Sequence, residues 1–382
     1  MGCSNQQDII IPEEIQELEN LTVIQSTLED ARVKASFTRE FTYGEADEII
    51  IGRVGDLAVD NLGRVYISDV QAQAINVFEP DGKFITTLGS EGRGPGGFNY
   101  VKKLKIHDKL LYAADANFGI RRINIFSLDS LSLKETVLVG KNENKYTLPE
   151  NSYPGIENIY IKSDGSYFVE YVANASIPDE MWQNVDHYGH IYMMDTGGEI
   201  ASEQVFRFKD AILVNKPEGA FSPIEPFWGI AIKKLNGEND FLLARPEDFL
   251  IKVYNQEGVY QKAFYYPKNK IPLTYETAIE AGVHEYYIQR MEFMDLPSNW
   301  PVIRSFIIDD KNNIWVATTV ENMNVYEWWL LEPSGELITT FDWSRDEPIE
   351  AIKNGKMYTR QTDEETGLEQ VVRYNVEING FK

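Results

Sequence analysis

The chain has 382 residues, of which 43% are hydrophobic and 12% aromatic, so it can bury a large core and is not intrinsically disordered. It carries 36 Lys and Arg residues against 60 Asp and Glu residues, which gives a formal net charge of −24. A field of this sign repels phosphate backbones, so nucleic acid is excluded as an expected partner.

The N-terminus holds the one cysteine of the chain, Cys3. A disulfide within the chain and a cysteine-based metal site are therefore excluded. The context Gly2-Cys3-Ser4-Asn5 resembles the end of a bacterial lipoprotein signal whose hydrophobic leader has been removed. We expect a lipid on Cys3, with a free cysteine as the alternative. N-myristoylation fits less well, because Gln6 stands where Ser or Thr is wanted.

Residues 1–35 are predicted to form a lipid-anchor tether and lead-in, and residues 36–382 the folded domain. Within the lead-in, 12–19 suit one or two turns of acidic helix and 21–24 a short strand. Segment 36–43 alternates apolar and polar residues, as a half-buried strand does. Beyond Cys3 no apolar run of ~20 residues occurs, so the lipid is the expected contact with a membrane.

A polar turn that leads into an apolar strand first appears at residues 61–69 and then recurs five times along the chain. Each copy places an aromatic residue at the same step: Tyr66, Tyr112, Phe168, Phe241, Trp315 and Tyr358. The shortest spacings, from Tyr66 to Tyr112 and from Trp315 to Tyr358, fall near the ~40–50 residues of a four-stranded propeller blade. The longer spacings indicate blades with insertions.

A second signal follows these anchors: an apolar strand, a turn with glycine at its tip and another strand. Segment 329–341 nearly copies segment 75–88, and weaker versions occur at 191–200 and 253–261. Glycine at a hairpin tip suits a positive φ, which other residues adopt at a cost. Two hairpins per period and six periods predict an all-β fold, a six-bladed β-propeller with four-stranded antiparallel blades.

Closure of the propeller requires that its first and last blades be joined. We predict that 36–43, or the strand before it, pairs with the last blade around 370–376. One long domain is compatible with this length, because each blade packs only on its neighbours.

Blade 1, from Gly55 to Phe98, resembles an NHL repeat in its succession of motifs, which ends in Gly-Arg-Gly-Pro-Gly-Gly-Phe. More narrowly, the chain resembles the six-bladed β-propeller lipoproteins of Bacteroidetes. The resemblance is strong in blade 1 and in the last two blades, where 303–309 opens a repeat, and it is loose in blades 3 and 4. It implies a fold and a lipid-anchored location in the cell envelope, at the outer membrane or on the periplasmic side. It implies no activity.

The first departure from the repeat is segment 172–190, which contains Asn174, Trp182, His187 and His190. Two histidines three residues apart could share a zinc ion, but a third ligand is not evident nearby. We therefore predict exposed loop histidines and no metal site.

The second departure is segment 267–300, where apolar residues follow helical spacing from 274 to 293. This predicts a helix across one face of the disc that packs its apolar side downward, through Ile279, Val283 and Met291 among others. Such a helix could also gate the channel or dock a partner. Trp182, Trp228 and Trp300 are candidate aromatic platforms for a sugar or peptide, with packing between blades as the alternative.

The central channel is the default ligand site of a propeller, because the innermost strands of all blades meet there. The candidates are polar residues near the starts of the predicted inner strands: Asp56, Lys103, Glu157, Arg304 and Glu350. Since these charges have mixed signs, they could instead form ion pairs that close the pore.

Two functions compete. The first is a lipid-anchored, monomeric binding module for a peptide, glycan or partner protein, without catalysis or cofactor. The second is a calcium-dependent hydrolase or lactonase in the channel, where Asp56, Glu157 and Glu350 would supply oxygens while Lys103 and Arg304 would oppose the cation. A Ser-His-Asp hydrolase is disfavoured, because no Gly-x-Ser-x-Gly motif occurs and the histidines fall in predicted turns or insertions. A structural scaffold without a ligand is a third, weaker interpretation.

Overall fold

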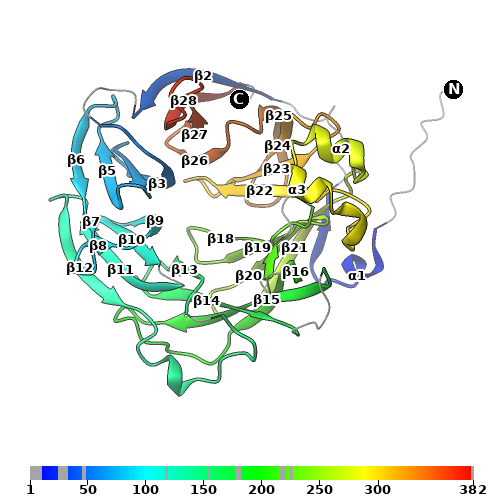
Figure 1. Ribbon diagram of the computed structural model, residues 1–382, viewed down its shortest axis with the longest axis horizontal. Coiled ribbons are helices and arrows are strands. Elements are labelled where there is room, and N and C mark those ends of the chain that lie inside the picture. The colour runs from blue at the N-terminus through cyan, green and yellow to red at the C-terminus, as the bar shows by residue number, and fades with distance from the viewer. Residues whose placement is uncertain are drawn as a thin grey trace.

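Six β-sheets surround a central axis in the computed structural model of the chain (Figure 1). The structure describes residues 11–24, 33–44, 49–116, 119–153, 155–176, 182–215, 221–223 and 227–379. Each sheet is a four-stranded antiparallel meander at its core, which confirms the predicted six-bladed propeller.

The blades follow one another in chain order. Blade 1 contains β3 (Val54–Val59), β4 (Val65–Asp69), β5 (Ala74–Phe78) and β6 (Phe84–Leu88). Blade 2 contains β9 (Val101–His107), β10 (Leu110–Ala116), β11 (Ile120–Ser127) and β12 (Ser132–Leu138). Blade 3 contains β13 (Asn158–Ile161), β14 (Tyr167–Asn174), β15 (Asn184–Met194), β16 (Phe206–Asn215) and β17 (Phe221–Pro223).

The second half of the ring repeats this order. Blade 4 contains β18 (Ile232–Leu235), β19 (Phe241–Arg245), β20 (Phe249–Tyr254) and β21 (Tyr260–Tyr266). Blade 5 contains β22 (Ile303–Ile308), β23 (Ile314–Thr319), β24 (Val325–Leu331) and β25 (Leu337–Ser344). Blade 6 contains β26 (Ile349–Lys353), β27 (Lys356–Thr362) and β28 (Glu369–Asn379). Between blades 1 and 2, β7 (Ser90–Glu91) and β8 (Gly97–Phe98) form a small parallel ladder, and a 3₁₀ turn (Glu143–Lys145) precedes blade 3.

The six repeated aromatic residues all lie on the second strand of their blades, as the repeat predicts. Each is buried between neighbouring sheets, with at most 6% of its surface exposed: Tyr66, Tyr112, Phe168, Phe241, Trp315 and Tyr358. Burial of an aromatic side chain is among the largest contributions that one residue makes to a core. The repeat in the sequence is therefore the repeat of the packing between blades.

Strand β2 (Lys34–Tyr43) pairs antiparallel with β28 and completes blade 6, which confirms the predicted closure. The lead-in contains the short acidic helix and the short strand that the sequence predicts. Helix α1 (Glu13–Gln16) buries Ile15, and β1 (Leu21–Val23) pairs parallel with β21 as a fifth strand of blade 4. Part of the stretch predicted as a tether thus covers an edge of the propeller, while Cys3 lies outside the described residues.

The glycines at the tips of the predicted hairpins have positive φ, from 76° at Gly258 to 92° at Gly335. At Gly82, with φ of 84°, an added Cβ would also lie 1.6 Å from Cε1 of Phe41 on the closing strand β2. Gly355 has a similar φ of 70° but open space around it.

We expect Gly355→Ala to cost about 1–2 kcal/mol through backbone strain. Gly82→Ala should cost roughly 1–3 kcal/mol more, because the Phe41 ring must move out of its packed position. Urea unfolding of the two variants measures this difference. Equal midpoints would show that the contact between the hairpin and β2 does not matter to stability.

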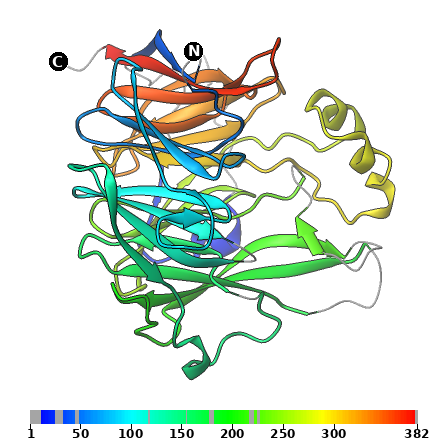
Figure 2. The same cartoon turned by 60° about the vertical axis from the view of Figure 1, so that its left-hand side comes forward.

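The helical insertion of segment 267–300 is present, but it does not lie flat on the disc. It forms α2 (Tyr275–Glu280), α3 (Glu285–Ile288) and a 3₁₀ turn (Met291–Phe293), and Figure 2 shows it standing away from the blades. Gly282, with φ of 68°, separates α2 from α3. The apolar residues on the two sides of this break therefore do not form one continuous helical face. Ile279, predicted to pack inward, is therefore 54% exposed, whereas Ala278 and Ile288 are buried.

Candidate functional site

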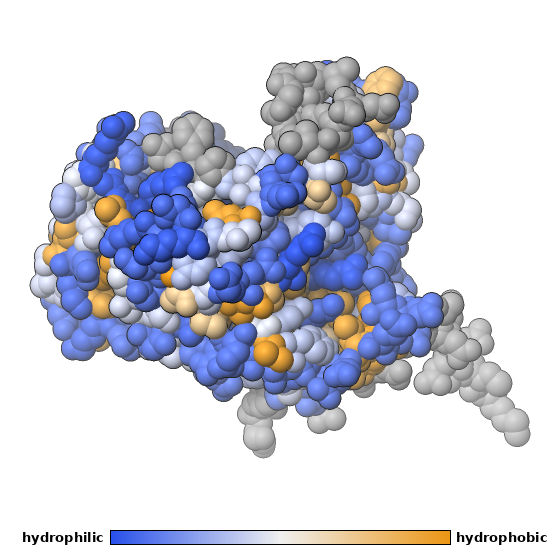
Figure 3. Space-filling model, turned by 90° about the horizontal axis from the view of Figure 1, so that it is seen from below, coloured by the Kyte–Doolittle hydropathy of each residue, from blue (hydrophilic) through white to orange (hydrophobic). Residues whose placement is uncertain are grey.

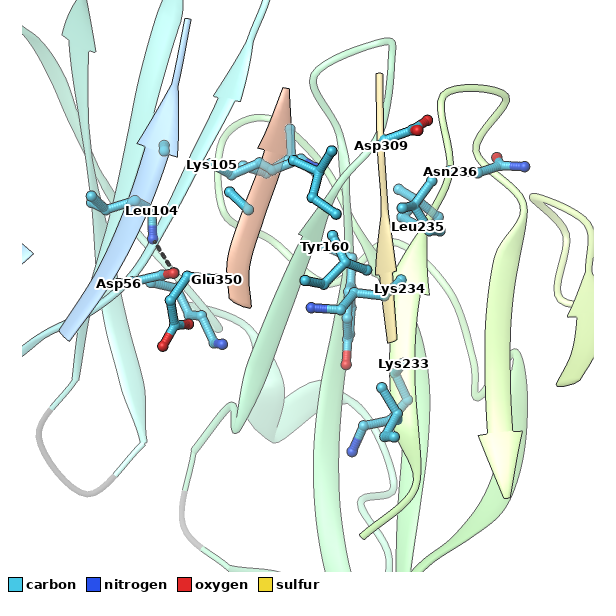
Figure 4. Close-up of a pocket in the computed structure, with 18 of the residues that line it drawn as sticks. Asp56, Leu104, Lys105, Tyr160, Lys233, Lys234, Leu235, Asn236, Asp309 and Glu350 are labelled. Atoms are coloured by element: carbon cyan, nitrogen blue, oxygen red, sulfur yellow. Dashed lines mark hydrogen bonds between the residues drawn. The ribbon is translucent and has the colours of Figure 1, made fainter. Parts of the chain in front are cut away.

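A channel of about 810 Å³ runs along the propeller axis, a volume within the usual range of ligand sites. Residues of the first strand of every blade line it: β3, β9, β13, β18, β22 and β26. Figure 4 shows side chains from several of these strands pointing into the same space. The innermost strands of the propeller therefore converge on one cavity that can hold a small molecule.

Four of the five predicted channel residues line this cavity: Asp56, Lys103, Arg304 and Glu350. The fifth, Glu157, lies directly before β13 and is not among the lining residues. Its backbone N–H donates to the carbonyl of Glu170 on the neighbouring strand at 2.7 Å. The sequence thus located the inner strands correctly, but it did not predict that Glu157 lies outside the channel lining.

The carboxylates of the lining already have partners within the walls. Oδ2 of Asp56 accepts a hydrogen bond from the backbone N–H of Leu104 at 2.9 Å. Glu350 pairs with Arg360 at 3.2 Å, on the adjacent strand of its own blade. Burial raises the pKa of Glu350, and Arg360 opposes this effect. These acids are therefore held against the blades.

Asp309 and Asp310 line the channel at the end of β22, and they too are engaged. Asp309 accepts hydrogen bonds from its own turn and from Nε1 of Trp315 at 3.0 Å. Asp310 accepts from the backbone N–H of Asn354 in the neighbouring blade at 3.3 Å. Both carboxylates thus stabilise turns at this end of the inner strands.

Three lysines of the lining differ from these acids: Lys103, Lys105 and Lys234. Their side chains are exposed within the channel, and no ion pair joins any of them to another residue in the described part of the chain. The surrounding walls and the like charge of Lys103 lower the pKa of Lys234 to about 8. Desolvation by the channel walls lowers the pKa of Lys105 as well, and Lys353 adds to this effect. The cavity therefore gathers three lysines without an ion-pair partner among the described residues, in a protein of net charge −24.

The sequence analysis missed Lys105 and Lys234. A usable signal existed, because Lys103 and Lys105 alternate with Leu104 on a predicted inner strand, as channel-facing residues do. On β18 two lysines are adjacent, and only the fold shows which of them is paired. Lys233 enters an ion-pair network, whereas Lys234 forms no ion pair with any residue in the described part of the chain.

That network lies between blades 3 and 4. Nζ of Lys233 lies 3.1 Å from Oε1 of Glu170 and 2.5 Å from Oδ1 of Asp210. Oε2 of Glu170 accepts from the Tyr160 hydroxyl at 2.8 Å, and Oδ2 of Asp210 lies 3.2 Å from Nδ1 of His187. Lys233 counteracts the effect of burial on Asp210, so that the pKa of this acid stays below its usual value. The ion pairs expected to close the pore are instead directed into the blade walls.

The prediction of exposed loop histidines at 187 and 190 is wrong. Both lie on β15 and are buried, with 8% and 6% of their surface exposed. Nδ1 of His190 lies 2.6 Å from Oε1 of Gln204, and burial lowers the pKa of His190. The segment predicted as an insertion contains the end of β14 and the start of β15, two unusually long strands that the short blade repeat did not anticipate. Asn174 ends β14 and is also buried.

The three candidate tryptophans belong to one apolar cluster beneath the helical insertion. Trp300 is only 3% exposed, and its Nε1 donates to Oγ1 of Thr277 at 3.0 Å, so it is a packing residue. Trp182 and Trp228 are partly buried against the same cluster. Trp228 and Trp300 also line a smaller cavity of about 120 Å³ beside Gly229, which borders the channel as well.

Within the ranges that the structure describes, no three His, Cys, Asp or Glu side chains are grouped so that they could hold a metal ion. Nor does any helix there have the length and apolar character needed to cross a membrane.

Residues 16–193 match the model of a protein family described as a 6-bladed beta-propeller. The sequence matches none of the curated proteins with which it was compared. Among solved structures, a member of the DUF4221 family from Bacteroides vulgatus has a TM-score of 0.56 at 11% identity, covering 91% of this chain and 99% of its own.

Two further structures show similarity over most of the chain. One is named as an exported protein from Bacteroides fragilis. It has a TM-score of 0.50 at 11% identity, and the match covers 94% of this chain and 99% of that chain. The other, virginiamycin B lyase from Staphylococcus aureus, has a TM-score of 0.43 at 13% identity, with 90% and 99% covered. A likeness as low as the latter supports no conclusion about activity. Together, the family match and the geometry of the sheets identify the chain as a six-bladed β-propeller.

Proposed function

We propose that this protein is a cell-envelope propeller that binds an anionic ligand in its central channel and does not catalyse a reaction. One observation carries the proposal: Lys103, Lys105 and Lys234 share a cavity in which they form no ion pairs among the described residues, while Glu350 pairs with Arg360 and Asp56 binds a backbone N–H. The like charges of these lysines repel one another, and a bound anion relieves that repulsion. The acid group of an envelope peptide, glycan or partner protein would supply such an anion.

Among the described residues, one side of the molecule shows no broad apolar docking site. The face in Figure 3 is mostly hydrophilic, with apolar residues scattered over it. Scattered apolar residues are normal on a monomeric protein, whereas interaction sites form contiguous patches. A binding module that works as a monomer is consistent with this face.

The proposed location in the envelope rests on two supports. The sequence around Cys3 resembles a lipoprotein processing site, although Cys3 lies outside the described residues. A protein of similar fold from Bacteroides fragilis has a name that describes it as exported. Lipid anchoring would be tested by expressing wild type and Cys3→Ser in a bacterium that processes lipoproteins. A lipidated protein should move from the membrane fraction to the soluble fraction on substitution.

The calcium-dependent hydrolase gains no support from the channel. Asp56 and Glu350 are the predicted oxygen ligands that face it, and Lys103 and Lys234 exert their charges on the same space. A hard cation needs six or more oxygens around it, and ammonium groups at close range oppose it. Calcium is therefore expected to leave the melting temperature unchanged, and a rise abolished by Asp56→Asn would favour the hydrolase.

Lys234→Met should weaken binding of a simple anion such as sulfate by roughly 10- to 100-fold, the value of one charge-assisted contact. Thermal melting with sodium sulfate, against sodium chloride at equal ionic strength, measures this, because a ligand of the native state raises the midpoint. The matched control is Lys109→Met, since Lys109 is an exposed lysine paired with Asp129. A sulfate response that survives in Lys234→Met would place the anion elsewhere.

Sulfate affinity should fall as the pH rises from 7 to 9, because the Lys234 amine becomes neutral around pH 8. The affinity can fall by up to roughly 10-fold if pairing depends on that one ammonium group. The charged groups around it are Lys103, Lys105, Asp56 and Glu350, and bound sulfate would raise the pKa of Lys234. Titration calorimetry at three pH values measures this fall in sulfate affinity. In Lys234→Met the affinity should no longer depend on pH over this range, and a fall that persists there would assign the titration to another group.

A further inference from the structure

The channel lysines occupy two levels along the propeller axis. Lys103 and Lys105 are two residues apart on β9, where the pairing with β10 is regular across both. In a strand, residues at this spacing point to the same side and have Cα atoms roughly 6.6 Å apart. Both side chains are exposed within the channel, so two positive charges follow one wall at different depths.

Other blades add further lysines to the channel. On β18, Lys234 also lines the channel, and the like charge of Lys103 contributes to lowering its pKa. Lys105, in turn, is affected by Lys353 at the end of β26. Figure 4 shows Lys105 and Lys234 reaching into the channel at different heights. The first level is defined by Lys103 and the second by Lys105, while Lys234 and Lys353 add positive charge to the same channel.

A carboxylate separates the two levels. Asp56 is fixed by the backbone N–H of Leu104, the residue between Lys103 and Lys105 on β9. An anionic group midway along the channel would therefore meet Asp56, whereas anionic groups at the two lysine levels would not. Glu350, the other acid near the first level, is paired with Arg360. Charge in a ligand is favoured at its two ends and disfavoured at its centre.

We infer that the channel binds a molecule with two anionic groups roughly 7 Å apart, the separation of alternate residues on a strand, with an uncharged segment between them. This inference rests on the proposed function, that the channel is an anion site, and names the class of ligand. Two charge-assisted contacts at fixed separation discriminate against ligands that carry only one of the charges.

The test is titration calorimetry of the full chain at low ionic strength, where exposed charges are weakly screened. The probes are succinate, adipate and suberate, each compared with the monocarboxylate of equal chain length: butyrate, hexanoate and octanoate. The dianion of intermediate length should bind roughly 10- to 100-fold more tightly than its monocarboxylate, the value of a second charge-assisted contact. Equal affinities would overturn the two-level arrangement while leaving an anion site intact, whereas no binding of either probe would overturn both.

Variants assign the two ends. Lys105→Met should abolish the advantage of adipate over hexanoate and leave hexanoate binding at the first level, and Lys105→Gln should behave in the same way. Lys109→Met, on the surface, should change neither affinity. Melting curves show whether each variant is folded, and we expect no loss of stability, since a repelled charge is removed. If both Lys105 variants still bind adipate more tightly than hexanoate by the wild-type factor, Lys105 does not bind the second anionic group.

A glycan and a peptide could both supply this chemistry. Digalacturonate and the blocked dipeptide acetyl-Glu-Glu-amide, titrated alongside galacturonate and acetyl-Glu-Gln-amide, distinguish these sources. A dianion advantage for either probe that is lost in Lys105→Met supports the inference. Failure of all the dianions, adipate included, to exceed their singly charged counterparts overturns it.

Discussion

Lys233→Ala is expected to destabilise the protein by roughly 3–5 kcal/mol, the usual cost of breaking a buried ion pair. The Lys233 ammonium lies between the carboxylates of Glu170 and Asp210, which are 0% and 8% exposed. Removal of the ammonium leaves two negative charges in the packing between blades 3 and 4, without solvent or a fixed cation to stabilise them. Urea unfolding followed by tryptophan fluorescence measures the loss.

Two comparisons make this prediction specific. Lys109→Ala breaks an ion pair in which both side chains are more than two-thirds exposed, so it should cost at most about 1 kcal/mol. The triple variant Lys233→Met, Glu170→Gln, Asp210→Asn removes all three charges and should recover much of the loss, because no buried charge is left unpaired. If Lys233→Ala costs no more than Lys109→Ala, the network does not hold the two blades together.

Trp315→Ala is expected to cost about 3–5 kcal/mol, as large-to-small changes in a core do. Trp315 is 2% exposed and packs with Trp328 and Phe341 in the core between blades 5 and 6. Its Nε1 donates to Oδ2 of Asp309 at 3.0 Å, so the variant also deprives that carboxylate of a donor. The loss would appear as a lower urea midpoint and a lower melting temperature.

Trp315→Phe separates the two contributions. It keeps an aromatic ring in the core and removes the indole N–H, so it should cost less than the alanine variant, about 1–3 kcal/mol. Equal losses in the two variants would assign the effect to the hydrogen bond with Asp309 and not to packing. That outcome would contradict the role of the repeated aromatic residue as the anchor of its blade.

The charge of the whole molecule and the charge of its channel have opposite consequences for an anionic ligand. The net charge of −24 repels an anion at a distance, whereas the lysines attract it inside the cavity. Salt screens the distant repulsion more effectively than contacts within a narrow cavity. Added salt should therefore speed the approach of a ligand while it weakens the bound state only modestly.

The blades were predictable because their signals are local. Gly82 and Gly335 mark hairpins through a backbone conformation that glycine adopts without strain, and φ is positive at both. The closing pair of β2 and β28 followed from a general requirement, since an open propeller would leave an edge strand unpaired. The pairing of β1 with β21 was not predictable, because no local pattern of three residues selects one sheet edge among several.

The candidate site was predictable in outline only. The sequence alone determined the number of blades, their order, the inner strands and an acidic surface, because each of these follows from composition or from a repeat within ~50 residues. The tertiary structure decided which charges are neutralised: it pairs Lys233 with two acids from blade 3 and leaves Lys103, Lys105 and Lys234 together in the channel. The physical reason is that a charge is compensated by whichever groups the fold brings within a few ångströms, and these come from blades far apart in the chain.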